Sequence, residues 1–383
     1  MSWIRPWARL AAASCAAAWL AACPSDPGGD GADGSAAPPG SGSPSASASR
    51  PASKPPSAAP ARADAARGKQ IYEVYCGFCH GDAGEGYVAD EAPKLASDDF
   101  LSVATDTYLR ETILRGRPGT TMSAWGKARG GPLEAADVSD VIAHLRSWQT
   151  SSNEDVHART LAGDAKRGEP VYAKHCQSCH GERGAGGRYA QLANSELLRL
   201  ASDGFLATTI ERGRRGTPMQ GFASVLAPRE VDDLVALIRS WKHAPEEALD
   251  LPPKPGKLVD VVIHPKGPQP AFDPKADFVK VDLVKQELDR GATMIIADAR
   301  AAGDYARQHI AGAISVPFYE AEAYAKQIPK DRYILTYCAC PHAASVKLRD
   351  ALRKLGYTRV AVLDEGIGYW NSKGYVVKSG SKP

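Results

Sequence analysis

The spacing of apolar residues divides the chain into segments with different predicted structures. An apolar run from Leu10 to Leu20 follows Arg5 and Arg9 and is too short to span a bilayer as a lasting helix. Residues 1–22 are therefore predicted to be a signal peptide. The next segment, residues 23–62, consists almost entirely of Gly, Ala, Ser, Pro and Asp. It cannot bury enough apolar surface to fold, so it is predicted to be a disordered tether.

After the tether, the pattern of apolar and polar residues repeats. Three stretches of the first copy have a counterpart in the second: "ARGKQIYEVYCGFCHGDAGEGY" matches "KRGEPVYAKHCQSCHGERGAGG", "ILRGRPGTTMSAW" matches "IERGRRGTPMQGF", and "DVIAHLRSW" matches "DLVALIRSW". In each copy a Gly and a Tyr stand four residues apart, on one face of a predicted first helix: Gly68 with Tyr72, and Gly168 with Tyr172. The repeat predicts two homologous all-α domains, at residues 63–150 and 160–243.

The last third of the chain has a different pattern. A Pro- and Lys-rich segment, residues 244–275, is predicted to be a linker. Beyond it, short apolar runs alternate with helical stretches such as "SVKLRDALRKLGY", and these runs are "TMIIADAR", "AISVP", "YILTYC" and "VAVLD". Strands that alternate with helices predict an α/β domain with a parallel sheet, at residues 276–383.

Charge and cysteine spacing narrow the function. The 383 residues carry a net charge of +3, which gives no basis for nucleic-acid binding. Two copies of C-x-x-C-H run from Cys76 to His80 and from Cys176 to His180. A C-x-x-C pair could form a redox disulfide or hold zinc. The histidine favours covalent haem attachment, because two thiols on one helical turn can bond to one edge of a porphyrin while the imidazole faces the iron.

These motifs resemble the class I cytochrome c family over residues 63–243. The resemblance implies two covalently bound haem c groups, with thioether bonds from Cys76, Cys79, Cys176 and Cys179 and iron ligation by His80 with Met122 and by His180 with Met219. Both methionines stand in a Gly-rich loop before the last helix, where this family places the sixth ligand. The alternative for a methionine is a flexible core filler. Ligation by His and Met raises the reduction potential, and a six-coordinate iron favours electron transfer over gas binding.

Other residues near the motifs are assigned to packing. Trp148 and Trp241 stand near the ends of the last helices, where the family packs aromatic residues against the first helix. Three further histidines are interpreted as surface or packing residues: His144, His157 and His175. Pro93 resembles the proline that supports the axial histidine in this family. The second repeat has "YAQLANSEL" and no equivalent proline, so no such support is predicted for His180.

The α/β segment resembles the rhodanese family from about Phe278 to the C-terminus. The matching stretches are "IIADARAAGDYARQHIAGAISVP", "YILTYCACPHAASVKLRDALRKLGY" and "VAVLDEGIGYW". In this family a cysteine after the central strand begins a loop of backbone N–H groups at a helix N-terminus, which lowers the thiol pKa and holds a persulfide anion. By position, the resemblance implies that Cys338 is the nucleophile.

The loop departs from the commonest form of that family. It has no Arg between Ala339 and Val346, so persulfide handling is favoured over thiosulfate specificity. Cysteine-phosphatase chemistry, which needs a cation for the phosphate, is disfavoured. A second thiol, Cys340, is an auxiliary candidate, although a one-residue gap would strain an internal disulfide. The alternative is a decayed sulfurtransferase that is kept as a docking domain.

The cysteine at the end of the apolar run bears on localisation. Cys23 follows "LAA", which resembles the lipobox of bacterial lipoproteins and implies lipidation of Cys23. The alternative is an ordinary signal peptide. Pro24 follows the cysteine where an inner-membrane retention signal has Asp, so the outer membrane is favoured. The chain is therefore predicted to be exported, to face the periplasm and to be held at a bacterial membrane by its lipid.

Together these assignments predict a lipid-anchored dihaem cytochrome c that is fused to a rhodanese domain. We expect it to pass electrons to another redox protein, a cytochrome or an oxidase. We also expect it to couple this transfer to oxidation of a small sulfur compound at Cys338, as an enzyme of the sulfurtransferase type. Two alternatives remain: a pure electron carrier whose rhodanese domain only docks a partner, and a sensor in which the haem state gates the thiol.

Overall fold

The computed structural model describes residues 62–89, 92–241, 248–339 and 342–383. The predicted signal peptide, nearly all of the predicted tether, and the thiols of Cys23 and Cys340 lie outside the described residues. Among the described residues, no helix combines the length and apolar character needed to cross a membrane.

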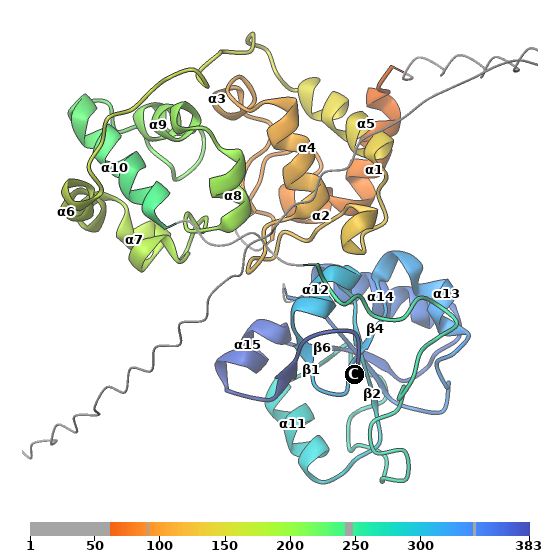
Figure 1. The fold of residues 1–383 in the computed structure, drawn as a ribbon. Helices are drawn as coiled ribbons and strands as arrows, with labels where there is room; N and C mark the ends of the chain where they lie inside the picture. The colour runs from red at the N-terminus through yellow and green to blue at the C-terminus, as the bar shows by residue number, and fades with distance from the viewer. Residues whose placement is uncertain (1–61, 90–91, 242–247, 340–341) are drawn as a thin grey trace, which may run out of the picture. The chain divides into compact units, whose positions relative to one another are not determined.

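The first helical domain is built around two crossing helices (Figure 1). Its elements are α1 (Ala65–Tyr75), α2 (Gly77–His80), α3 (Asp98–Leu101), α4 (Asp106–Arg115), η1 (Lys127–Arg129) and α5 (Ala135–Arg146). The Asp64 side chain caps α1 by accepting from the first free N–H groups. At the crossing, a Cβ on Gly68 would lie 1.9 Å from the Asp140 carbonyl oxygen. Only Gly therefore lets α1 approach α5 this closely.

The second helical domain repeats this arrangement. Its elements are α6 (Ala165–His175), α7 (Gln177–His180), η2 (Glu182–Gly184), α8 (Ser195–Leu200), α9 (Asp203–Arg212) and α10 (Pro228–Ser240). Asp164 caps α6 as Asp64 caps α1. A Cβ on Gly168 would lie 2.4 Å from the Asp233 carbonyl oxygen on α10. The Tyr172 ring packs edge-on against Trp241, with ring centroids 4.9 Å apart.

The third domain is a parallel sheet flanked by helices. Its elements are β1 (Phe278–Val279), α11 (Val281–Asp289), β2 (Ile295–Asp298), α12 (Ala302–Arg307), β3 (His309–Ile310), β4 (Ile314–Ser315), η3 (Phe318–Glu320), α13 (Ala321–Ala325), β5 (Ile334–Tyr337), α14 (Ala343–Lys354), β6 (Val360–Leu363), α15 (Gly366–Ser372) and β7 (Val377–Lys378). The strand order is β1-β6-β5-β2-β4, and every pair of neighbours is parallel. A separate antiparallel pair joins β3 to β7.

Burial explains why the central strands read as unbroken apolar runs. All four residues of β2, of β5 and of β6 are buried, because helices cover both faces of a parallel sheet. The linker is tied to this sheet, since Ile263 exchanges two backbone hydrogen bonds with Met294. The predicted fold class, two all-α domains followed by an α/β domain with a parallel sheet, is confirmed. The exact domain boundaries stay predictions.

Candidate functional site

The first C-x-x-C-H motif forms a single turn at the end of α1. The helix ends at Tyr75, Cys76 leaves the helical conformation, and α2 follows at once. The amide of His80 donates to the Cys76 carbonyl at 3.0 Å, and that of Cys79 donates to the same oxygen at 3.1 Å. This turn brings two thiols and one imidazole to the wall of one cavity. Burial raises the pKa of the Cys76 thiol to about 12, so this thiol is neutral at pH 7.

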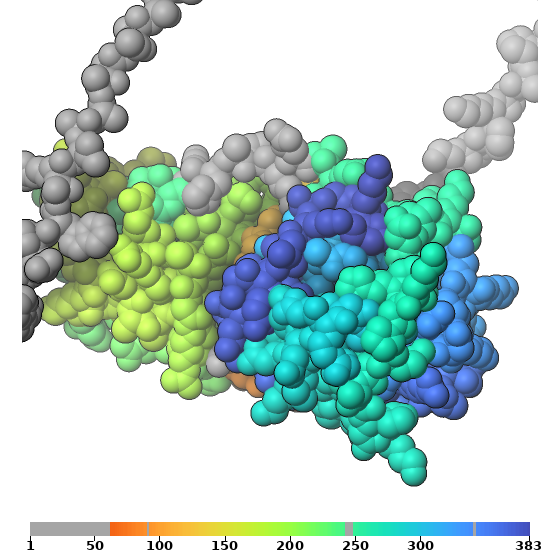
Figure 2. Space-filling model, turned by 90° about the horizontal axis from the view of Figure 1, so that it is seen from below, coloured from red at the N-terminus to blue at the C-terminus, as the bar shows by residue number. Residues whose placement is uncertain are grey.

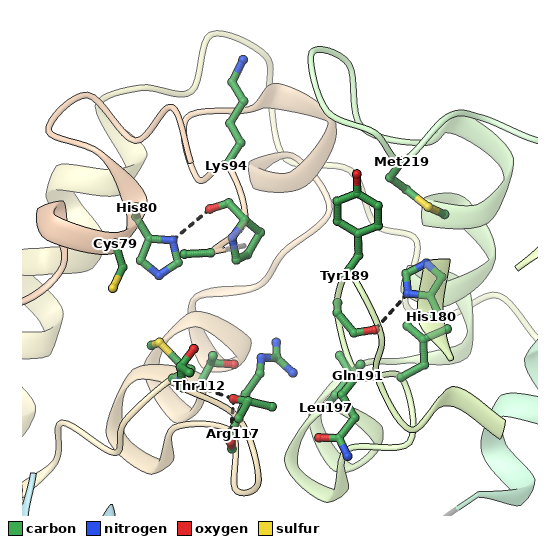
Figure 3. A pocket seen from close by; sticks show the side chains of 18 of the residues that line it. Cys79, His80, Lys94, Thr112, Arg117, His180, Tyr189, Gln191, Leu197 and Met219 are labelled. Atoms are coloured by element: carbon green, nitrogen blue, oxygen red, sulfur yellow. Dashed lines mark hydrogen bonds between the residues drawn. The ribbon is translucent and has the colours of Figure 1, made fainter. Parts of the chain in front are cut away.

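The imidazole of His80 is oriented by a backbone carbonyl. Its Nδ1 lies 2.9 Å from the Pro93 carbonyl oxygen (Figure 3). A carbonyl only accepts, so Nδ1 carries the proton and Nε2 of the neutral ring keeps its lone pair. Burial lowers the pKa of His80, which favours this neutral form. The ring is therefore prepared to ligate a metal through Nε2.

The second motif has the same backbone geometry. The Cys176 amide donates to Tyr172 at 2.9 Å, as Cys76 does to Tyr72 at 2.8 Å. His180 Nδ1 lies 2.9 Å from the carbonyl oxygen of Ala190, and this contact is the dashed line at His180 in Figure 3. An alanine carbonyl therefore provides the support that sequence analysis did not predict for this histidine. The acceptor is a backbone atom, and no residue type identifies it.

Met122 and Met219 stand in matching loops. The Met122 carbonyl accepts from the Arg117 amide at 2.9 Å, and the Met219 carbonyl accepts from the Arg214 amide at 2.7 Å. Both side chains line the same cavity as the two histidines. Met294, by contrast, is fully buried beside the parallel sheet and does not line that cavity.

The three histidines assigned to packing occupy different places. His144 is buried against the rings of Tyr72 and Trp148, with centroids 5.4 and 4.7 Å away. His157 places Nδ1 2.8 Å from the Ser202 hydroxyl, and neither of these two lines the cavity. His175 does contribute to the lining and packs edge-on against Phe222.

The cavity continues from the helical domains to the thiol of the third domain. Its volume is about 810 Å³, and its walls include the cysteines and histidines of both C-x-x-C-H motifs, Met122, Met219 and Cys338. Cys338 directly follows β5 and is almost fully buried. Its sulfur lies 3.4 Å from the hydroxyl of Ser345, in the first turn of α14. The Cys338 carbonyl accepts from the Ile367 amide at 3.1 Å, which fixes the start of the loop beneath α15.

Comparisons with known proteins account for both parts of the chain. Residues 63–145 and 163–238 match the family described as cytochrome c oxidase, cbb3-type, subunit III. Residues 280–373 match the rhodanese-like domain family. The chain has two tandem cbb3-type cytochrome c domains and a rhodanese-like domain. Such cytochrome domains bind covalent haem c, so this chain binds two haem c groups, one in each domain.

Individual relatives resemble parts of the chain. The cbb3-type cytochrome c oxidase subunit FixP of Azorhizobium caulinodans is 30% identical over 181 residues, which cover 46% of this chain and 59% of that protein. The dihydro-heme d1 dehydrogenase of Pseudomonas aeruginosa is 33% identical over 132 residues, which cover 33% and 25%. The chain thus spans about 60% of the length of the first FixP relatives. A solved rhodanese-like domain from Anabaena sp. is 24% identical, covers 28% of this chain and 80% of its own, and has a TM-score of 0.26.

The donor set on each repeat suits haem c. Each turn presents a thiol pair with the spacing of haem attachment, and each histidine has one ring nitrogen engaged and the other available. The cavity walls between them are mostly apolar, which would limit the access of water to a bound haem. Sequence reasoning missed two residues at this site. They are Ser345, beside the Cys338 sulfur, and Lys347, which reaches the first cytochrome domain. Neither stands in a pattern that would reveal its role.

Proposed function

We propose that each cytochrome domain holds one haem c through its own repeat. The assignments are thioether bonds from Cys76, Cys79, Cys176 and Cys179, and axial ligation by His80 with Met122 and by His180 with Met219. Support comes from the shared cavity lining and from the two Nδ1 contacts that leave Nε2 available. When bound, each haem gains or loses one electron at a time.

We further propose that Cys338 carries sulfane sulfur and that its oxidation feeds electrons to the haems. In the balanced step, the Cys338 thiolate and a hydrosulfide ion form one S–S bond, and one proton and two electrons leave. The product is a persulfide anion on Cys338. The oxidant of this step would be the pair of bound ferric haems, which could take up one electron each and so match the two-electron chemistry. The observation that carries this proposal is the position of Cys338 on the wall of the cavity that Cys79 and His80 also line.

The proposal is tested by mixing oxidised, haem-loaded protein with sulfide in a stopped-flow spectrometer. Wild type is compared with Cys338→Ser, and ascorbate serves as a reductant that does not need the thiol. We expect sulfide to reduce wild type fast and the variant at the slow rate of direct outer-sphere reduction, while ascorbate reduces both equally. If sulfide reduced both proteins at the same rate, the proposed coupling between Cys338 and the haems would be contradicted.

Two observations favour a second candidate, an electron carrier whose rhodanese-like domain only docks a partner. The Cys338 side chain is about 1% exposed, and the segment from Ala339 to Val346 has no Arg to bind an anion. Trapping with an alkylating reagent after sulfide treatment separates the two candidates. A trapped persulfide on Cys338 supports sulfur chemistry, and its absence supports docking. An alkylation rate that changes with the haem redox state would instead support a thiol sensor.

Location and partners belong to the same proposal. The names of several relatives place them in cbb3-type cytochrome c oxidases, so we propose that this chain delivers electrons to an oxidase or to another cytochrome.

We also propose export to the periplasmic side and anchoring through lipid on Cys23, with the outer membrane favoured. Mass spectrometry of the purified N-terminus tests this, because a lipidated Cys23 adds acyl mass and an ordinary cleaved signal peptide does not.

A further inference from the structure

The two C-x-x-C-H turns share one backbone geometry but carry different side chains. Counting back from each first cysteine, Val74 in the first domain corresponds to Lys174 in the second. Between the cysteines, Phe78 corresponds to Ser178. The first turn is therefore apolar and aromatic, and the second is polar and basic. Packing within the domains does not require this difference, because both turns are anchored by the same hydrogen bonds.

The rhodanese-like domain packs against one side of the first turn, while the Val74 side chain stays exposed. The Lys347 ammonium on α14 donates to the Val74 carbonyl at 2.8 Å and lies 4.2 Å from the centre of the Phe78 ring, within cation–π range. Phe318 packs edge-on against Phe78, with centroids 5.8 Å apart. Burial lowers the pKa of Lys347, because this contact removes part of its ammonium group from water.

A second aromatic contact extends the covered area. The Tyr75 ring lies 5.8 Å from that of Tyr319 and 6.3 Å from that of Phe318. Aromatic pairs at these separations add to the stability gained from area burial. Beneath this cluster, Gly77 is buried and His80 is about 8% exposed. The surface beside the first haem attachment turn is thus occupied by another part of the same chain.

The equivalent surface of the second domain is open. Gln177 and Ser178, between the two cysteines, are both exposed, and His180 is only partly buried. The exposed charges around this turn are mostly positive, from Lys174, Arg183 and Arg188 against Glu182. This part of the chain belongs to the yellow-green outer surface in Figure 2. A positive rim favours a partner with an acidic surface, because complementary charge speeds encounter.

We propose that the rhodanese-like domain permanently occupies the docking surface of the first haem, and that the chain exchanges electrons with an acidic protein partner through the second. The proposal rests on the assignment of one haem to each turn, but not on sulfur chemistry. With sulfur chemistry at Cys338, electrons would reach the first haem inside the chain and leave from the second.

The open surface is tested by charge reversal at Lys174. Full-length protein reduced with ascorbate is mixed with an oxidised small copper protein that has an acidic docking face, and the second-order rate is measured against ionic strength. We expect Lys174→Glu to lower the low-salt rate about tenfold and to flatten its salt dependence. Lys69→Glu, an exposed lysine on α1 with the same charge change, should alter the rate less than about twofold. Equal effects of the two variants would overturn the proposal.

The covered surface is tested by Lys347→Glu, with hydrogen exchange as a readout that needs no electron transfer. We expect the amide hydrogens of Cys79 and His80 to exchange faster, and those of Cys179 and His180 to be unchanged. We also expect a second fast phase in the electron transfer to the copper protein. The proposal would be contradicted by a folded variant in which the Cys79 and His80 amides exchange as in wild type and electron transfer to the copper protein keeps a single phase. Because ascorbate supplies the electrons, failure here is distinct from failure of sulfide oxidation, which Cys338→Ser with sulfide reports.

Discussion

The two cytochrome domains share an interior and differ at one edge. In both, a tyrosine hydroxyl four residues before the first cysteine reaches across the motif, from Tyr72 to the Gly81 carbonyl and from Tyr172 to the Gly181 carbonyl, at 2.8 Å each. At the attachment turn, Phe78 packs under the rhodanese-like domain, whereas Ser178 faces solvent. The comparison shows that both copies keep the same internal contacts around the C-x-x-C-H motif, which we call the shared frame. The side chains on the outer surface of each attachment turn differ and suit what lies beside that turn.

The largest expected effect on this shared frame comes from the helix crossing. Gly68→Ala places a Cβ where the Asp140 carbonyl already lies, 1.9 Å away, and Gly168→Ala meets the Asp233 carbonyl at 2.4 Å. We expect Gly68→Ala to lower the free energy of unfolding by roughly 3 kcal/mol and Gly168→Ala by somewhat less, at the upper end of overpacking costs. Urea unfolding of the haem-loaded protein, followed by the visible spectrum, measures both.

A matched control lies on the same helix. Lys69 is exposed on α1, so Lys69→Ala should change the free energy of unfolding by less than about 0.5 kcal/mol. Two glycine variants as stable as this control would show that the helices can separate without loss. The close crossing would then not be what holds the frame.

A smaller effect, equal in the two domains, is expected from a pair of equivalent arginines. Arg146 on α5 donates to the Leu101 carbonyl at 2.5 Å and to the Ala104 carbonyl at 2.6 Å. Arg239 on α10 makes the equivalent bonds, and both side chains are about 19% exposed. Removal leaves carbonyl groups without a partner, which costs roughly 2 kcal/mol. We expect thermal unfolding to show a similar loss of stability for Arg146→Ala and Arg239→Ala. A more than twofold difference between the two losses would show that the arginines are not equivalent.

Much of this frame is visible in the sequence, because local chemistry fixes it. The C-x-x-C-H spacing places two thiols and an imidazole on one turn, and a repeat of the motif predicts two such turns. The buried strands of the third domain are equally visible, since "IIAD", "ILTY" and "VAVL" are apolar throughout. These features depend on residues that are near one another in the chain, so the predicted fold class and the two haem groups are confirmed.

The differences between the domains could not be predicted. The partner of His180 is the Ala190 carbonyl, and every residue carries a carbonyl, so composition gives no signal. The cover over the first turn depends on Lys347 and Val74, which stand 273 residues apart. Such a pair is set by how whole domains pack. The repeat carries two traces of this packing, Phe78 against Ser178 and Val74 against Lys174. They have meaning only once the contact with the rhodanese-like domain is known.

The smallest effect sharpens a difference at the third helix of each domain. Asp98 accepts from the Thr150 amide at 2.8 Å and from its hydroxyl, and these bonds lower the pKa of Asp98 to about 2. The second domain has Ser195 at the corresponding position. Because the folded-state pKa of Asp98 is depressed, its contribution is present above pH 3.8, the ordinary value, and is lost as the pH falls towards 2.

Replacing Thr150 by Val removes the hydroxyl contact but keeps the amide. We expect Thr150→Val to raise the pKa of Asp98 towards its ordinary value, while the amide bond still holds it below. An NMR titration of the Asp98 carboxyl carbon measures the shift directly. The loss of stability that Asp98 protonation causes should still begin near pH 3.8 in the variant, but it should be smaller and should end at a higher pH. An unchanged Asp98 titration would mean that the Thr150 hydroxyl contributes nothing to this contact, and the third helices would differ only in sequence.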